Sequence, residues 1–268
     1  MVVLTRSMAA RRASLAHALP HDMAVEIAGC VAATSPRPVD DLRSLRASCR
    51  AMRAACSDRA VGRRVALERE AGAMRWSDHE RYLAVVGSLS GAGNPEACFL
   101  SGIALVFAHR CEGAGVQLLA QAAAAGHKVA GYVLAVLLYS KDDGATAGDV
   151  ARRHIREVEE EEAADGSGDV VGGCAKTAKK RSNNECVRCR GHAVEAVRQA
   201  TWNMADLPAP AVVMVQPKDD GYRCTAKGCG VPDAWCDSAV FCSEDCRIRH
   251  ERMMFFSQLP LTVANFVT

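Results

Sequence analysis

The 268-residue sequence is poor in aromatic residues and carries almost no excess of charge of either sign. Phe, Trp and Tyr make up 5% of the chain, and the formal net charge is +2 at pH 7. Such a small net charge gives no general attraction to nucleic acid or to an anionic membrane. No apolar run reaches the about 18 residues that a membrane-spanning helix needs. We therefore do not expect nucleic acid or a membrane among the partners of this protein.

The motifs of several enzyme classes are also missing. The sequence has neither a Walker loop for nucleotide phosphates nor the glycine pattern of dinucleotide-binding folds. Three histidines, His21, His109 and His127, have no Cys or carboxylate partner in a nucleophile motif. We therefore expect a protein that is not an enzyme.

Cysteine, in contrast, is abundant and unevenly placed. The chain has 13 cysteines, and eight of them lie between Cys174 and Cys246. No secretory signal is visible, so we expect a reducing compartment, cytoplasmic and/or nuclear, in which thiols are free or bound to metal. The first twenty residues contain Arg6, Arg11 and Arg12 but no acid, a composition that also suits an organelle transit peptide.

Four of the C-terminal cysteines have the spacing of metal ligands. Cys224 and Cys229 flank a tight loop that contains a glycine, and a helix that begins near Ser243 would present Cys242 and Cys246 on one face. Thiolates gathered in this way are the usual ligands of a structural Zn²⁺, which takes four and keeps no open position. We therefore predict that these four cysteines hold Zn²⁺ in a non-catalytic site. Buried free cysteines are the alternative.

A second metal site is a further hypothesis. His250 lies four residues beyond Cys246 on the same helix face, and Cys236 lies between the two cysteine pairs. Both could bind a second zinc, for which Cys186 and Cys189 are the paired ligands that remain. The alternative is a His250 that binds no metal.

Residues 14–70 are predicted to form a small helical bundle. Leu19-Pro20 opens a helix whose apolar stripe contains Met23 and Ile27, because proline suits a first helical turn. Two prolines then break this helix, and a third short helix is expected near residues 59–67. Between them, five apolar residues step by three and four and share one helix face, while arginines lie off it: Leu42, Leu45, Cys49, Met52 and Cys56.

The first two of these helices resemble an F-box, a family that docks onto a Skp-type adaptor and so onto a cullin ubiquitin ligase. The likeness rests on Leu19-Pro20-x-Asp22-x-x-Val25-x-Ile27 and on Asp41-Leu42-x-x-Leu45-x-x-Ser48-Cys49-Arg50. Ala24 stands where the family has a large aliphatic residue, and Met52 where it has an aromatic one. The resemblance implies contacts to the adaptor through Leu19, Pro20, Ile27, Leu42 and Leu45.

Residues 76–140 contain a partial internal repeat in an Ala-rich helical region. A period near 33 residues suits paired-helix repeats, and Gly126 is expected to cap the helix before it. The pattern Gly-Val followed by Ala-Ala-x-x-Gly-His resembles the Sel-type branch of tetratricopeptide repeats, which bind protein partners. A generic Ala-rich bundle is the alternative. The repeated positions are Gly93, Ala97, Phe99, Gly102 and Leu105, which return as Gly126, Ala130, Tyr132, Ala135 and Leu138.

The remaining chain divides by composition. Residues 141–184 have blocks of like charge and a Gly/Ser stretch, and are predicted to be a charged flexible linker in which residues 149–164 could form a helix. Residues 185–220 are expected to contain a helix, from His192 to Trp202, and a connector.

Residues 221–256 form the predicted zinc module. Its loop-then-helix cysteine pairs resemble a treble-clef finger. The stretch Phe241-Cys242-Ser243-x-x-Cys246-Arg247-x-x-His250 resembles the end of a MYND-type finger, which is a protein-interaction module. Met254 stands where the last cysteine of that finger would be.

These observations predict a mainly α protein with an F-box helical bundle, a repeat-like helical middle and a small treble-clef-like zinc module. The order of the three parts resembles plant F-box proteins. It implies a non-enzymatic substrate receptor of a Skp-cullin-F-box ubiquitin ligase, which binds a target protein through the repeat, the zinc module or both. The alternative is a zinc-dependent protein-interaction or transcription-associated protein with no link to a ligase.

Overall fold

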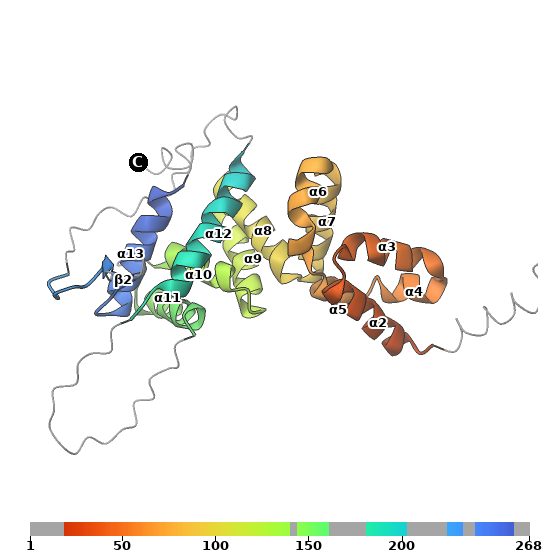
Figure 1. Cartoon of the computed structure of the whole chain (residues 1–268), viewed down its shortest axis with the longest axis horizontal. Helices are drawn as coiled ribbons and strands as arrows, with labels where there is room; N and C mark the ends of the chain where they lie inside the picture. The colour runs from red at the N-terminus through yellow and green to blue at the C-terminus, as the bar shows by residue number, and fades with distance from the viewer. Residues whose placement is uncertain (1–18, 140–143, 161–180, 203–223, 233–238, 260–268) are drawn as a thin grey trace, which may run out of the picture. The chain divides into compact units, whose positions relative to one another are not determined.

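A computed structural model describes residues 19–139, 144–160, 181–202, 224–232 and 239–259 (Figure 1). The chain divides into two compact units, Met1–Ser101 and Gly102–Thr268. Both are mainly helical, as predicted, and the strands of the described part are Val231–Pro232 (β1) and Ala239–Val240 (β2). Among the described residues, no helix combines the length and the apolar character needed to cross a membrane.

The first unit consists of short helices joined by tight connections, packed on an apolar core that includes Ala32, Val61, Leu67 and Tyr82. The last of these helices, α8, begins in this unit. The elements are α2 (His21–Thr34), α3 (Pro38–Ser48), α4 (Arg50–Ala55), α5 (Arg59–Arg64), a 3-10 turn at Leu67–Arg69, α6 (Ala71–Ser77), α7 (His79–Ala92) and α8 (Pro95–Ile103).

The predicted single helix that carries Leu42 through Cys56 is in fact two helices. Cys49 separates α3 from α4 because its backbone is extended, with φ −161° and ψ 169°. Its Sγ accepts the amide N–H of Met52 at 3.4 Å, which is the role of an N-cap residue. Leu42 and Leu45 therefore lie on a different helix from Met52.

The internal repeat has a structural counterpart at the helix ends. Gly93 follows α7 with a φ of 87°, and Gly126 lies just beyond α9 (Glu112–Ala124) with a φ of 89°. The residue after each glycine then caps the next helix. The side chain of Asn94 accepts the amide N–H of Ala97 at 3.0 Å, and that of His127 accepts the amide N–H of the corresponding alanine at 3.1 Å. The same turn thus recurs 33 residues apart, and the predicted capping by Gly126 is confirmed.

In the second unit α10 (Lys128–Leu138) is the central helix. It contacts α9, α11 (Gly144–Val158), α12 (Asn184–Thr201) and α13 (Glu244–Ser257). Every residue from Ala130 to Val136 is buried, which is typical of a helix surrounded on all sides. A π turn at Ala104–Ala108 connects α8 to the chain before α9.

The predicted linker needs correction. The helix expected within residues 141–184 exists as α11, but it is a packed helix that buries Ala151, Ile155 and Val158. These residues are spaced by four and three and form one apolar stripe, which the surrounding charges concealed in the sequence. Residues 161–180 of the same range lie outside the described part of the chain.

Two further boundaries also differ from the prediction. α12 begins at Asn184 instead of near His192, so Cys186 and Cys189 lie in its first turns, where both are buried. The division between the two units, after Ser101, falls inside the predicted repeat block 76–140. The reason is that α6 and α7 pack on the core of the first unit.

Candidate metal centre and partner-binding surfaces

Four cysteine sulfurs from two segments of the second unit meet in one cluster. The Sγ atoms of Cys224, Cys229, Cys242 and Cys246 all lie within 4.8 Å of one another. Cys242 Sγ is 3.4 Å from that of Cys224, 3.5 Å from that of Cys229 and 3.6 Å from that of Cys246. Four sulfurs about 2.3 Å from a tetrahedral zinc are about 3.8 Å apart. The predicted ligand set is therefore gathered at distances at which it can hold a metal ion.

The backbone around the first cysteine pair supports this arrangement. Gly228 has a φ of 75°, the left-handed conformation that the tight loop requires. The amide N–H of Ala226 points at Cys224 Sγ, and that of Cys242 at Cys229 Sγ, each at 3.4 Å. β1 and β2 pair antiparallel and bring the loop beside Cys242. Such N–H donors are the usual outer partners of metal-bound thiolates.

The second cysteine pair lies at the start of α13. The hydroxyl of Ser243 accepts the amide N–H of Cys246 at 3.2 Å and caps the helix, so the predicted helix start near Ser243 is confirmed. Glu244 and Asp245 occupy the first turn, where the positive end of the helix dipole stabilises negatively charged side chains. One thiol therefore precedes the helix and the other lies in its first turn.

The thiols of the cluster do not share one electrostatic environment. The N–H of Ala226 and the neighbouring thiol of Cys242 lower the pKa of Cys224 to about 7. Burial raises the pKa of Cys229 to about 12, and burial also raises the pKa of Cys246. Without a cation, Cys224 therefore loses its proton more readily than Cys229 or Cys246, whereas a bound dication favours the thiolate form of its ligands.

The described residues of the predicted second site lie on two helices, with Cys186 and Cys189 on α12 and His250 on α13. Burial raises the pKa of Cys186 well above its ordinary value and that of Cys189 to about 11, as expected for thiols in a helix core. The ring of His250 lies against that of Phe241, with centroids 5.1 Å apart, and burial lowers its pKa. These three residues form no metal-binding group in the described part of the chain. Cys236 lies outside that part.

The helix after Leu19-Pro20 presents large apolar side chains to solvent. On α2, Met23 is 56% exposed and Ile27 is 42% exposed. The buried residues of the same helix are small and include Ala24, which fills the position where an F-box has a large aliphatic residue. The outer side of α2 therefore carries large apolar side chains that the core does not use, next to the exposed charges of Asp22 and Glu26. Leu19 is half-buried and Pro20 is exposed.

The other two predicted contact residues have a different environment. Leu42 and Leu45 are half-buried and pack against the core of the first unit. Leu42 also lines a groove of about 1230 Å³ bounded by α3, α5 and α7. Unlike Ile27, these two leucines contribute to the fold itself.

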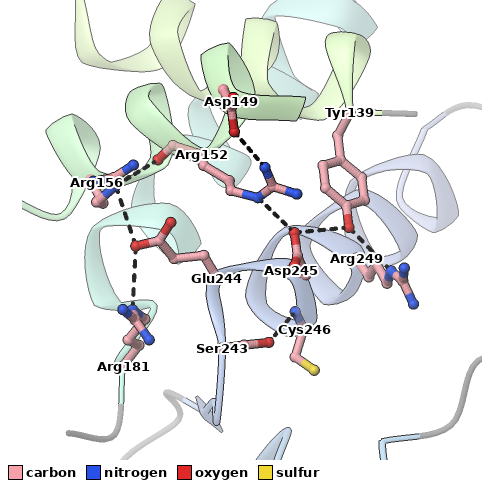
Figure 2. A network of polar contacts seen from close by, with 10 residues as sticks. All are labelled: Tyr139, Asp149, Arg152, Arg156, Arg181, Ser243, Glu244, Asp245, Cys246 and Arg249. Carbon is pink, nitrogen blue, oxygen red and sulfur yellow. Dashed lines mark hydrogen bonds and ion pairs between the residues drawn. The ribbon is translucent and has the colours of Figure 1, made fainter. Parts of the chain in front are cut away.

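A network of charged side chains surrounds the first turn of α13, and the sequence reading missed it (Figure 2). Glu244 lies 3.3 Å from Nε of Arg156 and 3.4 Å from Nε of Arg181. Asp245 accepts a hydrogen bond from Nε of Arg152 at 2.9 Å. The two arginines of α11 are four residues apart and so share a helix face, which is the signal that the sequence offered.

A second polar cluster is fully buried further along α13. The Glu251 carboxylate accepts hydrogen bonds from Arg190 Nη1 at 2.6 Å, Asn183 Nδ2 at 2.5 Å and the Tyr132 hydroxyl at 3.1 Å. Glu251 is 0% exposed, so its charge depends on these donors. The cluster joins α10, the segment before α12, α12 itself and α13.

Comparison with known proteins supports the helical-repeat and F-box interpretations in outline. Residues 76–183 match the family of plant tetratrico peptide repeats. That range begins at α6 and includes α11, beyond the predicted repeat block. The narrower likeness to the Sel-type branch stays a prediction.

Over 120 residues the chain is 34% identical to a candidate F-box protein of Arabidopsis thaliana. The matched part is 45% of this chain and 38% of the relative, so the chain spans well under half the length of that protein. No solved structure matches the chain. The resemblances are to a plant helical-repeat family and to an F-box protein.

Proposed function

We propose that the chain is a non-enzymatic substrate receptor of a Skp-cullin-F-box type ubiquitin ligase. The observation that carries this proposal is the outward apolar side of α2. Met23 and Ile27 are exposed although they are large and apolar, while alanines on the opposite side fill the core. A helix that keeps such side chains outside its own core is suited to a partner surface.

The likeness to an F-box protein gives the partner its class, a Skp-type adaptor that links the chain to a cullin. The helical-repeat match supports a second interaction, with a target protein, because paired-helix repeats are interaction scaffolds. The repeat helices, the metal module or both would bind that target. On this proposal the ubiquitin chemistry belongs to partner subunits.

We further propose that the four-cysteine cluster holds Zn²⁺ in a structural role. Four thiolates complete the tetrahedral coordination that zinc prefers and leave no position for a substrate or a reactive water. The ion would displace the protons of Cys229 and Cys246, whose pKa values burial raises, and would stabilise the resulting thiolates. Its contribution would be to fold the loop after Cys224 against the start of α13.

The test of the adaptor interaction is co-purification of the full chain with a plant Skp-type adaptor. Ile27→Asp places a charge on the exposed side of α2 and should abolish co-purification. The matched control is Leu83→Asp on α7, since Leu83 is 57% exposed in the same unit and lies outside the F-box-like helices. Charged substitutions of Leu42 or Leu45 are less informative because these residues pack on the core.

Retained co-purification of the Ile27→Asp variant would reject the proposed surface. A wild-type chain that fails to bind the adaptor would reject the ligase assignment as a whole. The chain would then be better explained as a zinc-dependent protein-interaction module. Circular dichroism of both variants checks that their helical content is unchanged.

A further inference from the structure

We propose that the repeat helices supply an outer shell for the four-cysteine metal site, so that metal binding and the packing of α13 stabilise each other. This inference rests on the metal site proposed for Cys224, Cys229, Cys242 and Cys246. It goes further by assigning positioning roles to residues outside the cysteine module. They are Tyr139 after α10, Arg152 and Arg156 on α11, and Arg181 before α12.

The first observation concerns the turn that carries two of the ligands. Between Cys242 and Cys246, the acids Glu244 and Asp245 both point at groups from the repeat helices, as Figure 2 shows. The side chain of Glu244 is only 12% exposed and lies between two arginines. Asp245 accepts a hydrogen bond from the hydroxyl of Tyr139 at 3.2 Å in addition to that from Arg152. The position of this turn is therefore fixed from outside the module.

The second observation is a backbone pairing next to the metal ligands. Arg181 and Phe241 exchange two backbone hydrogen bonds, of 3.1 and 2.8 Å. Phe241 is buried and immediately precedes Cys242. On α13, the fully buried Arg247 donates to the carbonyl of Ser182 at 2.9 Å. The chain that leads into α12 is thus hydrogen-bonded to both sides of the second ligand pair.

The third observation is that α13 continues from the metal site into the repeat core. The ring of Phe255 in α13 packs edge-to-face on the rings of Phe107 and Tyr132, with centroids 6.0 and 6.1 Å away. The Glu251 cluster lies between this contact and the cysteines along the same helix. Because Cys246 and Phe255 belong to one continuous helix, the position of either end constrains the other.

Two linked effects follow from this arrangement. Loss of the metal should loosen α13 on α10 and α12, and loss of the arginine contacts should weaken metal binding, because linkage is reciprocal. A Zn²⁺ ion with four thiolates has a net negative charge, so the loss of nearby positive charge also weakens binding through space. Salt screens that contribution, whereas a loss of positioning persists at high salt. The loss of metal affinity that remains at high salt therefore separates positioning from a through-space charge effect.

The decisive experiment measures Zn²⁺ affinity of the full chain by competition with a colorimetric chelator. The double variant Arg152→Gln and Arg156→Gln should bind zinc about 10-fold more weakly, the usual size of an outer-shell effect. Arg153→Gln is the matched control on the same helix, since Arg153 is 63% exposed and pairs within α11 with Glu157 at 3.7 Å. At high salt it should bind zinc as tightly as the wild type. A double variant that does the same would overturn the inference.

The reciprocal effect is read by hydrogen exchange of the wild-type chain with and without zinc. Removal of the metal should speed exchange in α10 and α12, and leave the first unit unchanged. A change confined to residues 224–246 would also overturn the inference while leaving the metal site intact. A wild-type chain that binds no zinc at stoichiometric concentration would instead defeat the metal site on which the inference rests. Far-UV circular dichroism of the metal-loaded variants controls for their folding.

Discussion

Each unit of the molecule buries a glutamate, and the two are accommodated in different ways. Glu70 in the first unit accepts a hydrogen bond from the amide N–H of Val39 at 3.1 Å. Burial raises the pKa of Glu70, and the nearby charge of Asp40 adds to that effect. Glu251 in the second unit has three donors, one of them the guanidinium of Arg190. Glu70 thus accepts a hydrogen bond from one backbone amide, whereas Glu251 accepts hydrogen bonds from side chains of α10, of α12 and of the segment before α12.

The difference shows where each unit places its charges. In the first unit the ion pairs are on the surface, as between Glu26 and Arg64, whose side chains are 63% and 47% exposed. Apolar packing therefore carries the stability of this unit, and its outer apolar side chains are available to partners. The second unit also has charged groups inside, among them Arg190, Arg247 and Glu251, and their contacts are strong only if each group is satisfied. Polar contacts thus specify how α13 lies on the repeat helices.

The largest expected effect comes from removing the buried acid. Glu251→Ala leaves the guanidinium of Arg190 buried without its partner, so we expect the second unit to lose about 3–5 kcal/mol of unfolding free energy. Glu26→Ala removes an exposed pair in the first unit and should leave stability unchanged within error. Urea unfolding of both variants, followed by hydrogen exchange on α13 and α2, measures the two effects. Equal losses in the two variants would remove the contrast between the units.

A smaller effect is expected where helices approach closely. A Cβ added at Gly115 would lie 2.5 Å from Cγ2 of Val106 and 3.0 Å from the carbonyl oxygen of Gly102, neither of which can move easily. Gly115→Ala should therefore destabilise the second unit by about 1–3 kcal/mol. In the first unit a Cβ at Gly29 would meet the guanidinium of Arg64 at 2.7 Å, at the end of a flexible side chain. Gly29→Ala should be neutral, because that side chain can swing away.

Thermal unfolding compares the two alanine variants with the wild type. A larger loss from Gly29→Ala than from Gly115→Ala would mean that the first unit is the more tightly packed of the two. It would also contradict the close backbone approach of α9, at Gly115, to Gly102 at the end of α8.

Much of the four-cysteine cluster and of the helix ends could be predicted from the sequence because their determinants are local. Cysteine spacing identifies the four thiols that the structure brings together, Ser243 marks a helix start, and Gly126 marks a helix end by its position after an apolar stripe. Each of these signals acts over a few residues. The helical class follows for the same reason.

What the sequence could not show depends on contacts between distant residues. The charges around Ile155 suggested a linker, and only the packing of α11 on α10 shows that its apolar stripe is buried. Cys49 fits an apolar helix face by spacing, yet its thiol caps a new helix. The partners of Glu244 and Glu251 come from residues separated by many positions in the chain, which no local pattern links.

The third prediction concerns the recurring turn at Gly93 and Gly126, where an alanine substitution should lower stability in both units. Gly126→Ala forces a side chain into the left-handed region in open space, so it should cost about 1–2 kcal/mol. Gly93→Ala should cost at least as much, because the same conformation is buried there. Asparagine tolerates this region better, so Gly126→Asn should recover part of the loss. Melting temperatures of the three variants test the ranking, and a harmless Gly126→Ala would show that this turn is not required.

The smallest expected effect concerns Glu70, the buried acid of the first unit. Because the pKa of Glu70 is raised in the folded state, ionisation is harder there than in the unfolded chain. Glu70 therefore leaves the free energy of unfolding unaffected below its ordinary pKa near 4.5. Above that pH it lowers the free energy of unfolding, until the pH passes the raised pKa of the folded state. Glu70→Gln keeps an oxygen for the Val39 amide and removes this loss, so its advantage over the wild type should grow as the pH rises from about 4.5 towards neutrality. Urea unfolding across that range measures it. A wild type that instead gains on the variant as the pH rises would mean that Arg37 and Arg81 stabilise the carboxylate more than burial penalises it.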